Sequence, residues 1–238
     1  MRLLSAIALV TVLCSPALAQ ERTQYVLAIS WQPAFCETRP DRPECESQTA
    51  DRFDAGAFAL HGLWPQPRSR DYCGVDAETV RTDEQGDWQD LPAPTLSAAL
   101  TAALAEAMPG TQSGLERHEW IKHGTCYDGD AEAYFADSLA MLEAINASDV
   151  AGLFAGAIGQ SLTQAEIRAA FDAEFGPGAG QRVRLSCIED GNRRLINELT
   201  IGLTGDIDGP ESLADRLLEA RPTDGGCKGG MVDPVGLQ

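Results

Sequence analysis

The chain has 238 residues, in which 18 lysines and arginines stand against 36 aspartates and glutamates, and its formal net charge is −18. A hydrophobic content of 44% supports a sizeable core and excludes a disordered tail or a fibre. The acidic balance counts against a protein that coats nucleic acid through a broad basic surface. It is compatible with a nuclease, which needs only a local cationic pocket.

The first nineteen residues have the pattern of an export signal. Arg2 precedes an apolar run over residues 3–13, and Ala-Leu-Ala at 17–19 is a small-x-small cleavage site. We therefore expect a signal peptide over residues 1–19, cleavage after Ala19, a periplasmic or secreted protein, and a single domain over residues 20–238. A retained anchor is the alternative, but the run is too short to span a bilayer. Since no later segment reaches about eighteen apolar residues, we expect no membrane association.

The cysteine count points to disulfides rather than to metal. Cleavage removes Cys14 and leaves six cysteines, an even number in an exported chain, which favours a disulfide framework. Six cysteines permit 15 connectivities, and the spacing does not choose among them, although Cys36 and Cys45 are close enough for a local loop. The absence of any C-x-x-C pair argues against a zinc knuckle.

The N-terminal half begins with strands and loops. Residues 25–31 form a β-rich run, residues 36–52 are charged and contain proline, and residues 57–61 form a second strand candidate that Gly62 and Pro65 should stop. Residues 65–94 are polar and hold four prolines, so they predict a long irregular connection, of the kind that is often functional or cross-linked.

Helices follow, and then strands return. The pattern predicts helices over residues 96–108, 150–158 and from a Thr-x-x-Glu capping box at 163–166 to about 175. Strands are expected over residues 182–188 and 195–203, with Gly191-Asn192 in the turn, and a last helix over 212–220. Strands, helices and strands in this order indicate a single α+β domain.

The three histidines carry the functional signal. His61 stands in His-Gly-Leu-Trp-Pro-Gln, and His118 and His123 stand in His-Glu-Trp-Ile-Lys-His-Gly-Thr-Cys. A lone histidine is more often structural, but two in one nonapeptide, with Glu119 and Lys122 between them, favour catalysis.

A zinc protease is the first class to test, since His118-Glu119 resembles the start of H-E-x-x-H. On a helix the second histidine of that motif follows at i+4 and faces the same metal. Here Lys122 occupies that position, and His123 at i+5 would point about 140° away from His118. We therefore expect no metal site.

Two or three imidazoles with a carboxylate and an ammonium suit phosphoryl transfer from an internal nucleophile. A neutral imidazole can take a proton from a ribose 2′-hydroxyl while an imidazolium donates one to the 5′-oxygen. Lys122 and a second imidazolium can stabilise charge on the non-bridging oxygens. Trp64 offers a face for base stacking, whereas Trp120 is expected to be a core residue.

These segments resemble the secreted ribonuclease T2 family: His-Gly-Leu-Trp-Pro at 61–65 matches its first active-site segment, and residues 118–126 match its second. The resemblance extends over about residues 25–227, loosely outside these segments. It implies an α+β fold with a central antiparallel sheet flanked by helices, and cofactor-free, metal-independent cleavage of single-stranded RNA. The products would be 2′,3′-cyclic phosphates and then 3′-phosphates.

The same resemblance implies roles for the residues. His123 would be the general base and His61 the general acid, with the roles exchanged in the hydrolytic second step. His118 would contact phosphate, and Glu119 and Lys122 would support the pentacoordinate state. The family also suggests the disulfides Cys73–Cys126 and Cys187–Cys227, which leaves Cys36–Cys45.

For the bases, the resemblance places Trp64 in a stacking role. Gln66 stands where some members carry an acidic residue that helps to read a base, so their base preference does not transfer to this chain. Trp31 and Gln32 are candidates for a second base site, and a plain strand-end position is an equal alternative.

Two other functions remain open from the residues. One is a catalytically silent member of the same fold that binds RNA or protein, although the full set of His61, His118, Glu119, Lys122 and His123 argues against it. The other is a periplasmic phosphoesterase of small nucleotides. We expect a monomer that takes single-stranded RNA as its substrate.

Overall fold

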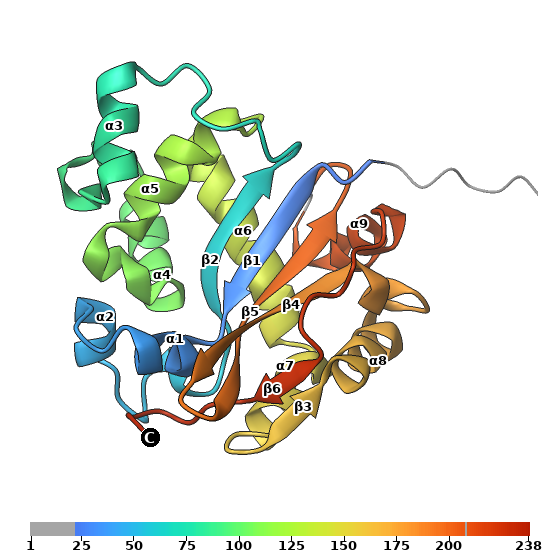
Figure 1. Ribbon diagram of the computed structural model, residues 1–238. Helices are drawn as coiled ribbons and strands as arrows, with labels where there is room; N and C mark the ends of the chain where they lie inside the picture. The colour runs from blue at the N-terminus through green and yellow to red at the C-terminus, as the bar shows by residue number, and fades with distance from the viewer. Residues whose placement is uncertain (1–21, 208) are drawn as a thin grey trace, which may run out of the picture.

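The computed structural model describes residues 22–207 and 209–238, which form an α+β fold around one sheet (Figure 1). Within these residues the sheet has the strand order β2-β1-β5-β6-β3, and β4 pairs with β5 off this path. The strands are β1 (Tyr25–Ser30), β2 (Ala59–Pro65), β3 (Ser161–Thr163), β4 (Val183–Asp190), β5 (Arg193–Leu203) and β6 (Gly229–Met231).

The sheet is mixed rather than purely antiparallel. Strand β1 lies antiparallel between β2 and β5, and the hairpin β4–β5 and the pair β3–β6 are antiparallel as well. A single parallel pairing, Leu195 with Met231, joins β5 to β6. The expected antiparallel sheet is therefore correct for β1, β2, β4 and β5, and the junction between β5 and β6 departs from it.

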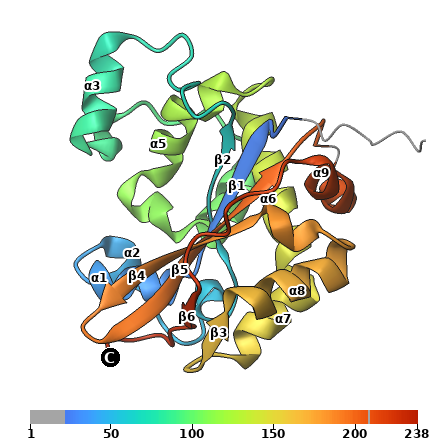
Figure 2. The ribbon, with the colours of Figure 1, turned by 45° about the vertical axis from the view of Figure 1, so that its right-hand side comes forward.

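Helices cover the sheet and its edges. They are α1 (Gln32–Thr38), α2 (Pro43–Glu46), α3 (Ala77–Gln85), α4 (Ala98–Ala107), α5 (Leu115–Lys122), α6 (Ala131–Asn146), α7 (Asp149–Gly156), α8 (Gln164–Phe175) and α9 (Leu213–Glu219). Helix α6 passes behind β1 and β2, and α5 with α3 outside it stands beside β2 (Figure 1). Figure 2 shows α7 and α8 side by side below the sheet.

The core lies between the sheet and α6, α7 and α8. Strand β1 lies between β2 and β5, and its residues Leu27, Ala28 and Ile29 are fully buried. The rings of Trp31, Phe58 and Phe154 pack against one another, with centroids 4.6–5.6 Å apart. Burial of such large apolar side chains is the main favourable term in folding, so this core holds β1 and β2 rigidly under the site.

A β-bulge shapes the strand that carries the first motif. In the β1–β2 register Ala28 pairs with Gly62 and Ile29 with Leu60, so His61 is the extra residue of β2. Bulges bend a strand and re-aim a side chain. At this bulge the His61 side chain reaches Glu198 of β5.

Several sequence predictions agree with the structure. Strands β1, β4 and β5 and helices α4, α7, α8 and α9 lie where the patterns place them. The capping box of α8 is present: Thr163 Oγ1 accepts a hydrogen bond from the Glu166 amide, and Glu166 Oε2 accepts one from the Thr163 amide.

Other predictions need correction. The second strand starts at Ala59 and continues through Gly62 to Pro65, and the predicted loop over 36–52 holds the end of α1 and all of α2. The connection over 65–94 contains α3, which Asp76 caps through the amides of Glu78 and Thr79. Helix α3 has hardly any apolar residues, so no hydrophobic periodicity reveals it. The 16-residue helix α6 was also missed.

The three pairs Cys36–Cys45, Cys73–Cys126 and Cys187–Cys227 are disulfides in the structure, the pairing that the family resemblance implies. The proposed signal peptide and its cleavage site lie outside the described residues. Among the residues that the structure describes, no single helix is long and apolar enough to cross a membrane. Helices α6 and α7 pass that test only jointly, by length and composition, across a 63° bend.

Candidate active site

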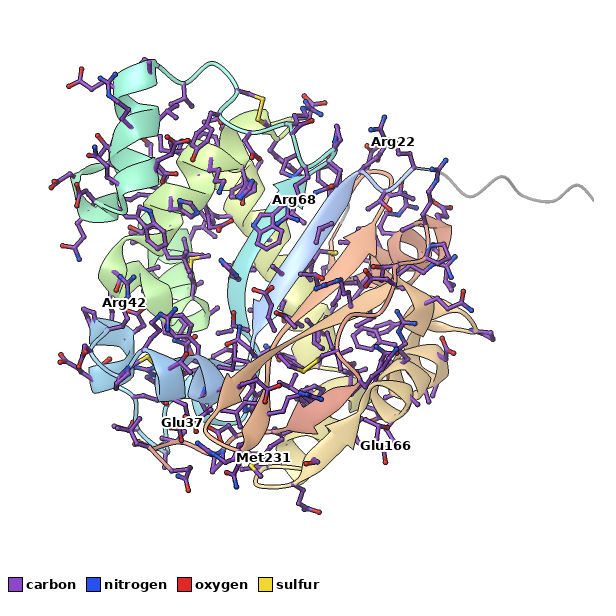
Figure 3. The ribbon with its side chains drawn as sticks, viewed as in Figure 1. Arg22, Glu37, Arg42, Arg68, Glu166 and Met231 are labelled. Atoms are coloured by element: carbon purple, nitrogen blue, oxygen red, sulfur yellow. A yellow bond between two sulfur atoms is a disulfide. The ribbon has the colours of Figure 1, made fainter. Side chains whose placement is uncertain are left out.

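A cavity of about 750 Å³ opens between β2, α5 and the surface of β4 and β5. Seven residues that the sequence singled out line it: His61, Trp64, Gln66, His118, Glu119, Lys122 and His123. Arg68 and Arg184 line it as well and bring positive charge into an acidic protein. Arg68 follows the end of β2 (Figure 3).

The His-Gly-Leu-Trp segment of β2 holds the buried carboxyl of Glu119, which comes from α5. A side chain at position 62 would overlap Glu119 Oε2, so only glycine lets α5 approach this closely. Trp64 Nε1 donates a 2.9 Å hydrogen bond to the same oxygen. The two motifs are thus one packed unit, and each fixes the geometry of the other.

The Oε1 atom of Glu119 faces the histidines. It is buried and has no hydrogen-bond partner within residues 22–207 and 209–238. It lies 3.6 Å from His61 Nε2 and 3.9 Å from His118 Nε2. Burial raises the pKa of Glu119, while the nearby charges of His61 and His118 oppose that rise. Three polar groups therefore converge on one point of the cavity.

His61 is held as an imidazolium. Its Nδ1 lies 2.6 Å from Oε2 of Glu198, a residue of β5. Burial by itself would lower the pKa of His61, but the hydrogen bond to Glu198 and the charges of Glu119 and Glu198 outweigh it and raise the pKa to about 9. At neutral pH this ring is a proton donor.

His123 is in the opposite state. Helix α5 ends at Lys122, and the ring of His123 lies against Trp64, with centroids 5.5 Å apart. Burial, reinforced by the positive charge of Lys122, lowers its pKa to about 3. Its Nδ1 is 3.3 Å from Asp71 Oδ1. A neutral imidazole at neutral pH can accept a proton.

His118 is the third imidazole. Its Nδ1 lies 2.7 Å from Oδ1 of Asp83, and the indole of Trp88 stacks on its ring at a centroid distance of 4.3 Å. Its Nε2 faces Glu119 Oε1, which places this nitrogen on the cavity side of the ring.

The geometric argument against a metal needs correction. It assumed regular helix geometry through His123, but this residue is the C-cap of α5 and its φ is −112°. Potential ligand atoms of His118, Glu119 and His123 all lie within 4.8 Å of one another. The donor set nevertheless fits a dication poorly, because the ammonium of Lys122 and the imidazolium of His61 line the same cavity.

Trp31 and Gln32 are not in this cavity. The Trp31 side chain is 1% exposed, packs in the aromatic core and donates from Nε1 to the Asp233 carbonyl at 2.8 Å. Gln32 begins α1 and is 5% exposed. The second base site proposed for this pair is wrong, and the strand-end alternative holds. Trp120 packs against the core, with its ring 6.0 Å from that of Tyr134, as expected.

Sequence reasoning missed the carboxylates that lie beside the imidazoles: Asp71, Asp83 and Glu198. They come from the connection after β2, from α3 and from β5, and no spacing links them to the histidines. Aspartate and glutamate are common in this chain, so their residue type carries no signal by itself.

Comparison with known proteins bears on the family of this chain. The profile of the ribonuclease T2 family matches residues 22–212. Ribonuclease I of Escherichia coli (strain K12) is 31% identical over 236 residues, which cover 90% of this chain and 87% of that protein. Ribonuclease MC of Momordica charantia is 25% identical over 160 residues, covering 65% of this chain and 75% of that protein.

Solved structures share the fold. The SF11-RNase of Nicotiana alata, 18% identical, aligns with a TM-score of 0.53 over 79% of this chain and 89% of its own. RNase NT in complex with 5′-AMP, 22% identical, aligns with a TM-score of 0.53 over 90% of this chain and 99% of its own. With its family profile matched over most of its length and a relative at 31% identity, the chain belongs to the ribonuclease T2 family and is an endoribonuclease.

Proposed function

We propose that this protein cleaves single-stranded RNA without a metal, by attack of a ribose 2′-hydroxyl on the adjacent phosphorus. The observation that carries the proposal is the convergence of His61 Nε2 and His118 Nε2 on the unpartnered Oε1 of Glu119. A phosphoryl oxygen placed there would meet donors from two sides. The neutral ring of His123 lies in the same cavity.

In the first step His123 takes the proton of the 2′-hydroxyl, and the 2′-oxygen bonds to phosphorus. His61 donates its proton to the 5′-oxygen as the bond from phosphorus to that oxygen breaks. This leaves a 2′,3′-cyclic phosphate and a free 5′-hydroxyl. The pKa values of the two histidines, displaced in opposite directions, support this assignment of base and acid.

Charge builds up on the non-bridging oxygens as the five-coordinate phosphorus forms. Lys122 and His118 can stabilise it, and Glu119 holds the geometry through Trp64 and His61. In the second step water opens the cyclic phosphate, with the histidine roles exchanged. The product is a 3′-phosphate.

The cavity supports binding of a polyanion in spite of the net charge of −18. Arg68, Lys122 and Arg184 line it together with the imidazolium of His61. We assign base stacking to Trp64 and a base contact to Gln66, whose Nε2 donates to the Trp64 carbonyl at 3.2 Å. The RNase NT structure in complex with 5′-AMP is consistent with a nucleotide ligand.

The organisation of the chain belongs to the same proposal. We infer a signal peptide over residues 1–19 that is cleaved after Ala19, a single catalytic domain over 20–238, a periplasmic or secreted location and a monomeric state. Three disulfides support an oxidising compartment.

The test uses the mature chain from Gln20 onward with its disulfides formed. It is incubated with single-stranded RNA in excess EDTA, and the new 3′ ends are analysed. We expect cyclic phosphate ends that disappear in His61→Ala and His123→Ala. Intact RNA from a folded protein would instead indicate a silent, binding member of the fold. A strong preference for dinucleotides over polymer would indicate a phosphoesterase of small nucleotides.

A further inference from the structure

Helix α3 presents one buried side chain, and it faces the active site. Of the nine residues of α3, all of them described, only Asp83 is buried, and its side chain is 1% exposed. The helix therefore contributes almost nothing to the apolar core. Burying a carboxylate is costly unless it is paired, so this placement calls for a reason outside core packing.

The partners of Asp83 supply that reason. Its Oδ1 lies 2.7 Å from His118 Nδ1, and its Oδ2 accepts a 2.7 Å hydrogen bond from the Tyr72 hydroxyl. Burial tends to raise the pKa of Asp83, but the hydrogen bonds from His118 and Tyr72 outweigh it and lower the pKa, so the group stays ionised. An ionised acceptor fixes a proton on Nδ1 of His118.

Trp88, from the short turn after α3, fixes the plane of the same ring. Its indole lies nearly parallel to the imidazole, at 21°. Its Nε1 donates to the Asp83 carbonyl at 3.2 Å. One segment thus contacts His118 both at its edge and on its face.

The segment that contains α3, residues 72–91, is attached to the helix that carries His118. The backbone N–H of Tyr72 donates a 2.8 Å hydrogen bond to the Lys122 carbonyl, and Cys73 forms a disulfide with Cys126. On the far side of α3, Arg117 Nη1 donates to the Leu91 carbonyl at 2.9 Å. These contacts attach the segment that carries Asp83 to α5 at both of its ends.

We propose that Asp83 is the positioning residue of His118. It accepts a hydrogen bond from Nδ1–H and supplies the counter-charge when Nε2 is also protonated, and the protonated Nε2 then donates to the phosphate beside Glu119 Oε1. The inference rests on the proposed function, because it assigns the phosphate contact to His118. It gives the predicted irregular connection over 65–94 a role, as the support of one catalytic imidazole.

The kinetic test is a double-mutant cycle on RNA cleavage. Asp83→Ala should lower kcat/KM by about 10–100-fold, and the nearly isosteric Asp83→Asn should fall between it and the wild type. In a His118→Ala background, Asp83→Ala should cause no further loss, because its effect passes through that ring. The control is Glu84→Gln, which removes an exposed carboxylate from the same helix and should leave kcat/KM unchanged.

A spectroscopic test reads the ring directly. The chain has 3 histidines, so 15N-histidine labelling yields few signals, and His118→Ala assigns its own. In the wild type and in Glu84→Gln, Nδ1 of His118 should carry a fixed proton. In Asp83→Asn and Asp83→Ala the proton should exchange between the two nitrogens.

The outcomes separate this inference from the proposed function. Any one of three results would overturn the positioning role and leave RNA cleavage by the wild type intact. These are full activity in Asp83→Ala, an additive loss in the double variant, and an unchanged His118 spectrum in Asp83→Asn. If the wild type cleaves no RNA, the proposed function fails. Even in that case, a fixed proton on Nδ1 of His118 that is lost in Asp83→Asn would support the contact between Asp83 and His118.

Discussion

Replacing Glu198 with glutamine should shift the alkaline limb of the pH profile. The carboxylate of Glu198 is the first contact that raises the pKa of His61 to about 9, through a 2.6 Å hydrogen bond and through its charge. Glutamine keeps an acceptor but removes the charge. Because burial continues to disfavour the imidazolium, we expect the limb to fall by about two pH units.

The direction and the size of the expected loss of activity in Glu198→Gln follow from the role of His61 as the acid. A proton donor is active below its pKa and inactive above it, so activity is lost as the pH rises through that value. If the limb falls by about two units from about 9, the protonated fraction at pH 8 drops from about nine-tenths to about one-tenth. We expect roughly a tenfold loss of kcat/KM at pH 8 and less than about a threefold loss at pH 5.5.

The assay is kcat/KM on a single-stranded RNA substrate from pH 4.5 to 9.5 in EDTA. Glu189→Gln is the matched control, because this exposed β4 carboxylate pairs only with Arg194 among the contacts described for it. Its profile should match that of the wild type. A Glu198→Gln profile with an unshifted alkaline limb, or a loss of equal size at every pH, would refute the assignment of His61 as the acid.

Three further predictions test the supports of the site. Gly62→Ala should lower kcat at least about 100-fold, because the added methyl group displaces Glu119; wild-type turnover would contradict the close approach. Replacing both Cys73 and Cys126 with serine should lower the free energy of unfolding by about 4 kcal/mol in denaturant titrations, given their separation of 53 residues, and an unchanged midpoint would count against it. Trp31→Phe should cost about 2–4 kcal/mol of stability without changing relative kcat/KM among dinucleotides, and a changed base preference would restore the second base site.

Local patterns were sufficient for much of the fold. Apolar runs located β1, β4 and β5, and the Thr163–Glu166 capping box located the start of α8, because these signals act within a few residues. Helix α3 escaped because it is almost entirely polar, and β2 was placed too early because Gly62 looked like a stop. In the folded chain that glycine stays in the strand and makes room for Glu119.

The residues that we propose as catalytic could be picked from the sequence because they lie in two short segments, which together supply His61, His118, Glu119, Lys122 and His123. The protonation states of His61 and His123 were not readable. The pKa of His61 depends on Glu198, which reaches the ring from another strand, and the pKa of His123 depends first on its burial in the folded chain.

The sequence by itself thus indicated the candidate groups of the site, the α+β class and the six cysteines that follow residue 19. Only the tertiary structure decided the partners of these groups: Glu198 of β5 beside His61 at the β2 bulge, Trp64 beside the C-cap residue His123, and Asp83 of α3 beside His118. The physical reason is the distance along the chain over which each property is set. Residue type and short periodicity are local properties, whereas a pKa or a ring orientation is set by burial and by partners up to 137 residues away along the chain.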